Sequence, residues 1–277
     1  MFEVGTCDGR VLILKVGETP LGVEEIRKNC AGYAAIRELG LGRLIPEISS
    51  WSVGEREAFI LMEHCGNDFV TESRRLSDPE AMYRQLVDLL RDVYQYSIAM
   101  RRRGGGRTVL VAKQRIATLY SQQLGPVLDR QGHHAPLIER VQKVAIEAGP
   151  LSCFASWEFA PRNVFLSDGR LKFADPNWVV TGLPIIELAM FAGMARDNMH
   201  LPGSDLGYQV IEDFAVCELS ELLRIEHRDA QKTFWIGRAL QCLLGARNRL
   251  SKFGNAHPQV PTLFGLGITY LEKVVAG

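Results

Sequence analysis

Apolar positions follow two different periods along the chain. The first 66 residues contain short apolar runs bounded by turn residues, at 10–16 and within 57–66, which predict β-strands. Between these runs, residues 21–39 carry apolar positions at helical spacing. Beyond residue 67 the helical period prevails. A few strands followed by many helices indicate an α+β fold, with a small β-rich lobe and a large helical lobe.

Turn and cap residues mark the boundaries of these elements. Cys7-Asp8-Gly9 predicts a hairpin turn before the first run, and Ser77-Asp78-Pro79-Glu80 is typical of a helix start with a capping residue and an N1 proline. We expect residues 1–66 to form the small lobe and residues 67–277 the helical lobe. The later helices are expected at residues 136–148, 184–196, 208–223, 230–253 and 262–275.

Composition excludes several classes of function. The 277 residues are 47% hydrophobic, which is enough for one or two cores. Lys plus Arg equals Asp plus Glu at 32 each, so no net field attracts nucleic acid or an anionic membrane. The six cysteines form no Cys-x-x-Cys pair, as expected for thiols in a reducing compartment. With no apolar run near the roughly 18 residues of a membrane span and no leader-like start, we expect a cytoplasmic protein.

One stretch carries the chemistry of phosphoryl transfer. Glu158 is followed five positions later by Asn163, and Asp175 lies twelve residues further on, after the apolar run 171–174. Two short apolar segments around Ser167-Asp168-Gly169 predict a tight hairpin, with Asn163 at its entrance and Asp175 at its exit. Two carboxylates and an amide in this arrangement can surround one Mg²⁺-phosphate and one hydroxyl.

The stretch from residue 156 to residue 175 resembles kinase-like phosphotransferases of the aminoglycoside and choline kinase type. Those families carry a His-Gly-Asp, four intervening residues, an Asn, a hairpin and an acid that holds the metal. The resemblance implies a protein-kinase-like two-lobed fold that uses ATP and Mg²⁺, with Glu158 as the catalytic group and Asn163 and Asp175 as metal ligands. The chain diverges at the chemistry itself, since Glu158 replaces the family's catalytic Asp and Ser156 replaces its His.

The resemblance also implies roles in the small lobe. Lys15 interrupts an apolar run, and the family's lysine at this place contacts nucleotide phosphates and pairs with a glutamate of the next helix. Glu24 and Glu25 are both candidate partners, of which we favour Glu25; the alternative is a strand lysine in solvent. Glu63 to Gly66 correspond to the hinge, whose backbone binds adenine. The family's glycine-rich loop has no evident counterpart before Lys15.

Two functions of different classes follow. In the first, the protein is an ATP- and Mg²⁺-dependent kinase for a hydroxyl of a small molecule. The acids between residues 197 and 221, which occur there without Lys or Arg, suit a cationic acceptor such as an aminoglycoside or amino alcohol, although a solvated acidic helix face explains them equally well. In the second, the fold is a catalytically impaired pseudokinase that binds or regulates. Nucleotidyl transfer, a third function, is not separated from these by any residue.

Overall fold

The computed structural model describes residues 1–38, 40–101, 153–156, 159–167, 169–176, 179–182, 184–254 and 257–276. The chain divides into two compact units. The first unit comprises Met1–Arg75 and Ser156–Val179, and the second comprises Leu76–Ala155 and Val180–Gly277. The expected α+β class is confirmed, because a small antiparallel sheet lies in the first unit and most of the described helices lie in the second. The helix expected at 136–148 lies outside the described residues.

A four-stranded antiparallel sheet begins the first unit. Its strand order is β1-β2-β4-β3, and the predicted turn joins β1 to β2, with Gly9 at a φ of 82°. A positive φ is readily adopted by glycine because it has no Cβ. The strands are β1 (Phe2–Gly5), β2 (Val11–Gly17), β3 (Ile48–Val53) and β4 (Ala58–Glu63).

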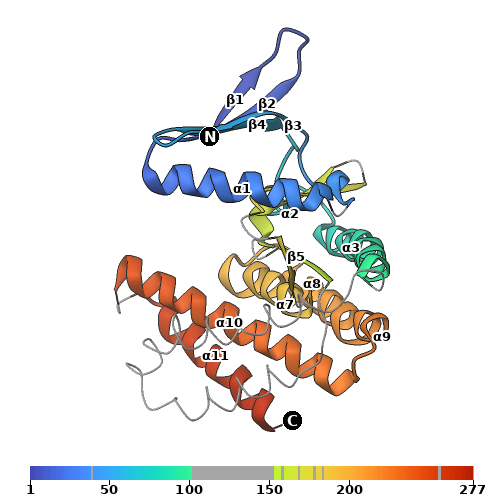
Figure 1. The fold of residues 1–277 in the computed structure, drawn as a ribbon. Coiled ribbons are helices and arrows are strands. Elements are labelled where there is room, and N and C mark those ends of the chain that lie inside the picture. Colours follow the sequence, from blue (N-terminus) through green and yellow to red (C-terminus); the bar gives the residue numbers. More distant parts are fainter. Residues whose placement is uncertain are drawn as a thin grey trace. The chain divides into compact units, whose positions relative to one another are not determined.

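Helix α1 (Pro20–Glu38) lies against one face of this sheet, as Figure 1 shows. Its buried side chains include Val23, Ile26 and Ile36 at helical spacing, and Ile60 of β4 is buried as well. Lys15 lies opposite Ile60 in the β2–β4 register, so its side chain projects from the same face of the sheet as Ile60. The helix expected at 21–39 is therefore confirmed to within one residue at each end.

The predicted hairpin is present in the first unit. Strands β6 (Val164–Ser167) and β7 (Arg170–Phe173) pair antiparallel, with Val164 opposite Phe173. Asp168 of the turn lies outside the described residues. Phe165 forms an isolated antiparallel bridge with Asp68, so the hairpin lies beside the chain that follows β4. Three short helical segments complete the described part of this unit: η1 (Gly42–Leu44), α2 (Phe69–Ser73) and η4 (Pro161–Asn163).

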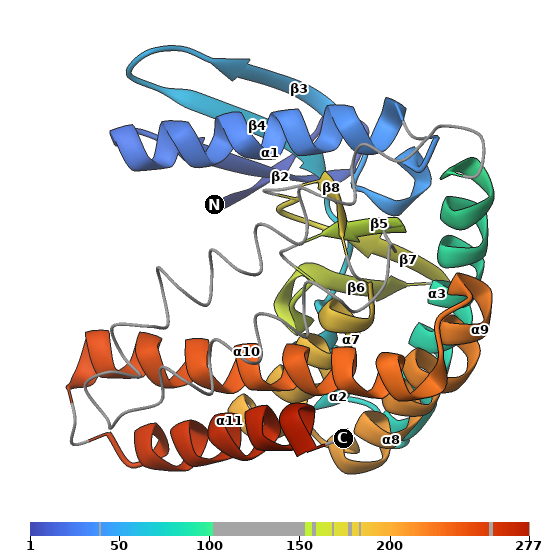
Figure 2. The same cartoon turned by 60° about the horizontal axis from the view of Figure 1, so that its bottom comes forward.

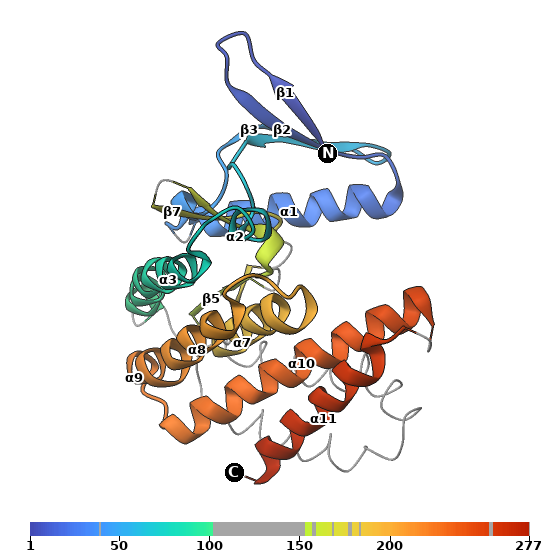
Figure 3. The same cartoon turned by 180° about the vertical axis from the view of Figure 1, so that it is seen from behind.

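Helices build the second unit. Helix α7 (Pro184–Gly193) contacts α10 (His227–Phe253), and α10 runs beside α11 (Gln259–Ala276), as Figures 2 and 3 show. Strands β5 (Cys153–Ser156) and β8 (Val179–Gly182) form a separate two-stranded sheet. None of the described helices combines the length and the apolar character that a bilayer span requires. Large buried side chains fill the helix contacts, among them Tyr83, Phe191, Phe214 and Phe234.

Helix boundaries match the expectations only in part. The helices expected over 230–253 and 262–275 begin three residues earlier, as α10 and α11, and end within one residue of the expected position. Helix α3 (Pro79–Arg101) begins where its cap predicts, because the Asp78 carboxylate accepts a hydrogen bond from the Ala81 N–H at 3.1 Å. The helix expected over 184–196 passes into a π-helical turn, η5 (Met194–Asn198). Such a turn takes in one extra residue, which a 3.6-residue period does not register. The helix expected over 208–223 is divided for the same reason into α8 (Ser204–Asp213), η6 (Phe214–Glu218) and α9 (Leu219–Leu223).

A buried ion pair lies within the second unit. Arg238 of α10 is 0% exposed and pairs with Asp197 of η5, whose other oxygen accepts from Arg196 at 2.8 Å. Glu218 pairs with Arg91 of α3 at 2.7 Å. Both carboxylates belong to the acid-rich segment 197–221, so arginines from other parts of the chain neutralise two of the acids that suggested a cation pocket.

Candidate active site

Lys15 and Asp175 meet in the first unit although 160 residues separate them. The Lys15 Nζ lies 3.0 Å from Oδ1 of Asp175 and 2.7 Å from Oε1 of Glu25. Glu24, the other candidate partner, pairs instead with Arg27 at 2.6 Å. The structure thus brings Lys15 into contact with one of the two helix glutamates and with the acid expected to hold metal.

Two further residues of α1 complete this arrangement. Asn29 is buried, and its Oδ1 accepts a hydrogen bond from Lys15 at 3.0 Å. The Tyr33 hydroxyl accepts one from the backbone N–H of Asp175 at 3.2 Å. Sequence reasoning missed both residues, although the four-residue steps from Glu25 to Asn29 to Tyr33 place them on one face of the helix. We call Lys15, Glu25, Asn29 and Asp175 the Lys15 cluster.

The hairpin brings Asn163 close to Asp175. The backbone carbonyl of Asn163 accepts a hydrogen bond from the N–H of Ala174 at 2.9 Å, which closes the open end of the hairpin. Asp175 follows with a φ of 51°, in the left-handed region where Asn and Asp are tolerated best among non-glycine residues. The bond from its N–H to Tyr33 holds this conformation. Asn163 and Asp175 therefore lie at the entrance and exit of the hairpin, as their spacing predicts.

Asn163 and Asp175 fit a magnesium ion. Mg²⁺ prefers oxygen ligands and is usually bound through one or two carboxylates together with water and substrate phosphates. The Asp175 side chain keeps 24% of its surface accessible, and Asn163 is half-buried. Within the part of the chain that the structure describes, no three His, Cys, Asp or Glu side chains converge on a metal position. An ion here would need further oxygen ligands, such as water or a substrate phosphate.

The cluster favours a charged lysine. Burial alone would lower the pKa of Lys15, but the charge of Asp175 and the hydrogen bonds to Glu25 and Asp175 outweigh it and raise that pKa above its ordinary value. Burial, and then the charge of Asp175, raise the pKa of Tyr33, so its phenol stays protonated. Lys15 therefore presents a permanent positive charge beside Asp175.

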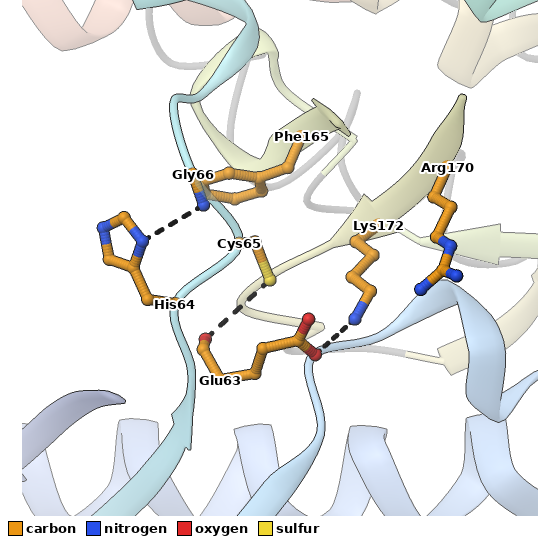
Figure 4. A pocket seen from close by; sticks show the side chains of 7 residues that line it. All are labelled: Glu63, His64, Cys65, Gly66, Phe165, Arg170 and Lys172. Atoms are coloured by element: carbon orange, nitrogen blue, oxygen red, sulfur yellow. Dashed lines mark hydrogen bonds and ion pairs between the residues drawn. The ribbon is translucent and has the colours of Figure 1, made fainter. Parts of the chain in front are cut away.

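A pocket of about 300 Å³ lies at the end of β4, against the β6–β7 hairpin. Figure 4 shows it with Glu63, His64, Cys65 and Gly66 on one side and Phe165, Arg170 and Lys172 on the other. Its volume falls at the lower end of the range for small-molecule pockets. The Phe165 ring offers a flat apolar surface on which a planar base can stack.

The Glu63 side chain ties the hinge segment to the hairpin. Its carboxylate forms an ion pair with Lys172 and accepts a hydrogen bond from the Glu47 N–H at 3.0 Å. Burial would raise the pKa of Glu63, but these bonds lower it below its ordinary value. Backbone groups of the same segment are engaged as well, because the Gly66 N–H donates to Nδ1 of His64 at 3.3 Å and the Glu63 carbonyl accepts from the Cys65 thiol at 3.8 Å. The φ of 82° at Gly66 gives that backbone a conformation which favours glycine.

The structure places the described residues of the expected site in two groups. Lys15, Glu25 and Asp175 are in direct contact, Asn163 lies across the hairpin end, and Glu63 and Gly66 line the pocket. Glu158, the expected catalytic group, lies outside the described residues. The chemical role of each of these residues stays a prediction.

Comparison with known proteins defines the class of fold. No family model matches the chain, and no curated protein sequence matches it. Solved structures do match: the small antiparallel sheet, the hairpin and the helical part together form the kinase-like fold of aminoglycoside phosphotransferases. The predicted fold class is confirmed by this likeness.

Three solved structures illustrate the likeness. A thermostable mutant of aminoglycoside phosphotransferase APH(4)-Ia has a TM-score of 0.63 at 15% identity, covering 98% of this chain and 90% of that one. A putative aminoglycoside phosphotransferase from Ralstonia eutropha JMP134 has a TM-score of 0.54 at 11% identity, covering 98% and 88%. APH(3'')-Id from Streptomyces rimosus ATCC10970, in complex with ADP and streptomycin, has a TM-score of 0.50 at 14% identity, covering 86% and 89%.

Proposed function

We propose that this protein is an ATP- and Mg²⁺-dependent phosphotransferase acting on a hydroxyl of a small molecule. One observation carries the proposal: Nζ of Lys15, a cation that can bind phosphates, lies 3.0 Å from Oδ1 of Asp175, an acid that can bind metal. The two residues are 160 positions apart in the sequence. A largely buried lysine paired with a specific carboxylate is a candidate functional residue. The fold supports the proposal, since the similar structures are phosphotransferases and one of them is a complex with ADP.

Each described residue of the site has a part in this chemistry. A bound Mg²⁺ would supply charge neutralisation at the transferred phosphoryl group, held by Asp175 and Asn163. Lys15 binds phosphate oxygens, and Glu25 keeps its ammonium in place. The hinge backbone hydrogen-bonds the base, which stacks on Phe165. Because the transition state is loose, positioning and neutralisation of charge carry most of the catalysis.

The acceptor belongs to the same proposal. Glu158 orients the acceptor hydroxyl and takes its proton, a contribution typically worth about 10²–10⁴-fold. We propose a cationic acceptor such as an aminoglycoside or amino alcohol, because streptomycin occupies the Streptomyces rimosus structure. Free thiols are recorded at Cys7, Cys30, Cys65, Cys217 and Cys242, which fits the cytoplasm, where ATP is available and thiols stay reduced.

Calorimetric titration with ATP and Mg²⁺ tests the proposal. We expect the wild type to bind, and Asp175→Asn to weaken Mg²⁺-dependent binding by at least about tenfold, since even the loss of an outer-shell metal contact costs about 10–100-fold. Glu24→Gln is the matched control, because it removes a carboxylate of the same unit that pairs with Arg27 and not with Lys15. Folded wild-type protein that does not bind millimolar ATP would show that the proposal is wrong.

Release of ADP then separates a phosphotransferase from a binding module. It is measured with aminoglycosides, amino alcohols and nucleosides as acceptors. Glu158→Gln should abolish transfer while ATP still binds, because a neutral amide cannot accept the proton. Equal rates for the wild type and this variant would remove Glu158 from the mechanism, and ATP binding without transfer to any acceptor would identify a pseudokinase.

A further inference from the structure

Asn29 is a polar residue in an apolar position. It is 0% exposed, and the other buried residues of α1 are Val23, Ile26, Gly32, Tyr33 and Ile36. A buried amide is unfavourable unless it is hydrogen-bonded. Its Oδ1 accepts from Lys15 at 3.0 Å, so the lysine supplies part of that compensation.

From this contact we infer that Asn29 is a positioning residue of the phosphate site, which orients the ammonium of Lys15 without neutralising it. The inference rests on the proposed function, in which Lys15 binds nucleotide phosphates. It assigns to α1 a second acceptor for the lysine, one helical turn beyond Glu25.

The donors of Lys15 can be counted. A lysine ammonium has three N–H donors, and three acceptors lie around this one: Glu25 at 2.7 Å, Asn29 at 3.0 Å and Asp175 at 3.0 Å. A donor becomes available to a phosphate only when one acceptor withdraws. Asp175 is the acceptor with a second task, since it is the proposed metal ligand. When it withdraws, Glu25 and Asn29 still hold the other two donors, so the free one keeps a defined direction.

The charge of the acceptor matters as much as its position. Lys15, Glu25 and Asp175 together carry a net charge of about −1 at neutral pH. Asn29 adds an acceptor and no charge, so the attraction of Lys15 for a phosphate is not reduced further. An aspartate at this place would hold the ammonium equally well and would repel the phosphate.

Neighbouring residues keep Asn29 at a constant place. Tyr33 binds the backbone of Asp175 at 3.2 Å, one turn further along α1. Gly32 lies against Pro176 so closely that a Cβ on it would overlap the Pro176 carbonyl oxygen. These two contacts hold α1 against the segment that carries Asp175. Asn29 is held relative to both members of the Lys15–Asp175 pair.

A double-mutant cycle tests the contact without nucleotide. In the wild-type background, Asn29→Leu should lower the melting temperature, because Lys15 loses a hydrogen-bond acceptor. In a Lys15→Met background the same change should lower it less, because the contact with the ammonium is already absent. Equal effects in the two backgrounds would show that Asn29 does not act through Lys15.

Affinities for ATP with Mg²⁺ and for adenosine test the positioning. Asn29→Leu should weaken ATP binding by about tenfold, as expected for a charge-assisted contact, and leave adenosine binding unchanged. Asn29→Asp keeps the side-chain size and the fold, and its added charge should produce the same selective loss. Gln241→Leu, a buried amide of α10, is the matched control and should alter neither affinity.

The outcomes are distinct. Parallel losses for ATP and adenosine, or unchanged affinity for both, would overturn the positioning role of Asn29. If the wild type binds no ATP, the proposed function is wrong, and the double-mutant cycle still decides for or against Asn29 as the residue that holds Lys15.

Discussion

The polar side chains Lys15 and Arg91 differ in how far they are buried from solvent and in how many partners they have. Lys15 is largely buried and satisfies its donors with three acceptors, whereas Arg91 keeps a third of its side chain exposed and pairs with Glu218 at the surface. The exposed pair is worth about 0–1 kcal/mol, while breaking a buried pair costs several. The contacts of Lys15 therefore fix the positions of the groups around it, whereas the Arg91–Glu218 pair contributes little to the structure around it.

The rate at which the Cys65 thiol is alkylated is a measure of its environment in the pocket at the end of β4. Burial, and then the charge of Glu63, raise the pKa of Cys65 to about 11. The thiolate is the reactive form, so below pH 11 its fraction rises about tenfold with each pH unit. At pH 8 we expect iodoacetamide to modify Cys65 roughly ten- to a hundredfold more slowly than an ordinary exposed thiol.

Mass spectrometry of the modified peptides between pH 7 and pH 10 measures this rate. Cys7, which is exposed, serves as the internal control. A Cys65 rate that stops rising by pH 9 would contradict the raised pKa. Bound ATP should slow the reaction further, because Cys65 lines the pocket assigned to the base.

At the scale of elements, α1 organises the candidate site. One face of this helix carries Glu25 and Asn29 for Lys15, and Gly32 and Tyr33 for the segment after β7. The same helix packs on the sheet through apolar residues. A single element therefore joins the strand that carries Lys15 to the hairpin whose end carries Asp175. Any change that shifts α1 should therefore alter the positions of both Lys15 and Asp175.

Gly32→Ala tests this role of α1. The new Cβ would overlap the backbone carbonyl of Pro176, which has no flexible end that can move aside. We expect a loss of about 1–3 kcal/mol in the free energy of unfolding, as for overpacked sites, together with weaker Mg²⁺-dependent ATP binding because Asp175 is displaced.

Gly265→Ala is the matched control for urea unfolding. Gly265 lies in α11, and a Cβ there would meet no atom within 4 Å. Alanine should stabilise this helix by about 0.5–1 kcal/mol. Equal stability of the two variants would contradict the close packing of α1 on Pro176.

On the scale of the whole molecule, the first compact unit is discontinuous in sequence. It joins Met1–Arg75 to Ser156–Val179, and its contacts run from one segment to the other, as in the pairs Lys15–Asp175 and Glu63–Lys172. The hairpin adds the buried side chains of Val164 and Phe173. A domain boundary near residue 66 stays a prediction. The first unit continues past residue 66 to Arg75 and also includes Ser156–Val179.

A fragment of residues 1–75 should not fold cooperatively by itself. It lacks the hairpin, both ion pairs and the backbone against which Gly32 packs. So short a chain buries too little surface to make up that loss. Circular dichroism during heating should show a gradual change for the fragment and a cooperative transition for the full chain. Addition of residues 156–179 through a flexible linker should restore cooperativity; a sharp transition in the fragment alone would contradict this view.

The sequence by itself determined some of the elements and the local part of the site. Period and caps predict α1 and the start of α3, and the turn residues predict the hairpin that joins Asn163 to Asp175. These features depend on hydrogen bonds and side-chain spacing over a few residues, which the order of amino acids encodes directly. The resemblance to phosphotransferases rests on the same short stretch of chain.

Only the tertiary structure decided which of these groups meet. Glu25 and Glu24 are equivalent in the pattern of the helix, and the way α1 packs selects Glu25 for Lys15. The four-residue spacing places Asn29 on the same helix face as Glu25, but its contact with Lys15 follows only from the packing of α1 on the strand that carries the lysine. Partner choice depends on the complete packing of sheet, helix and hairpin, where burial makes each polar group dependent on whichever partner lies within reach.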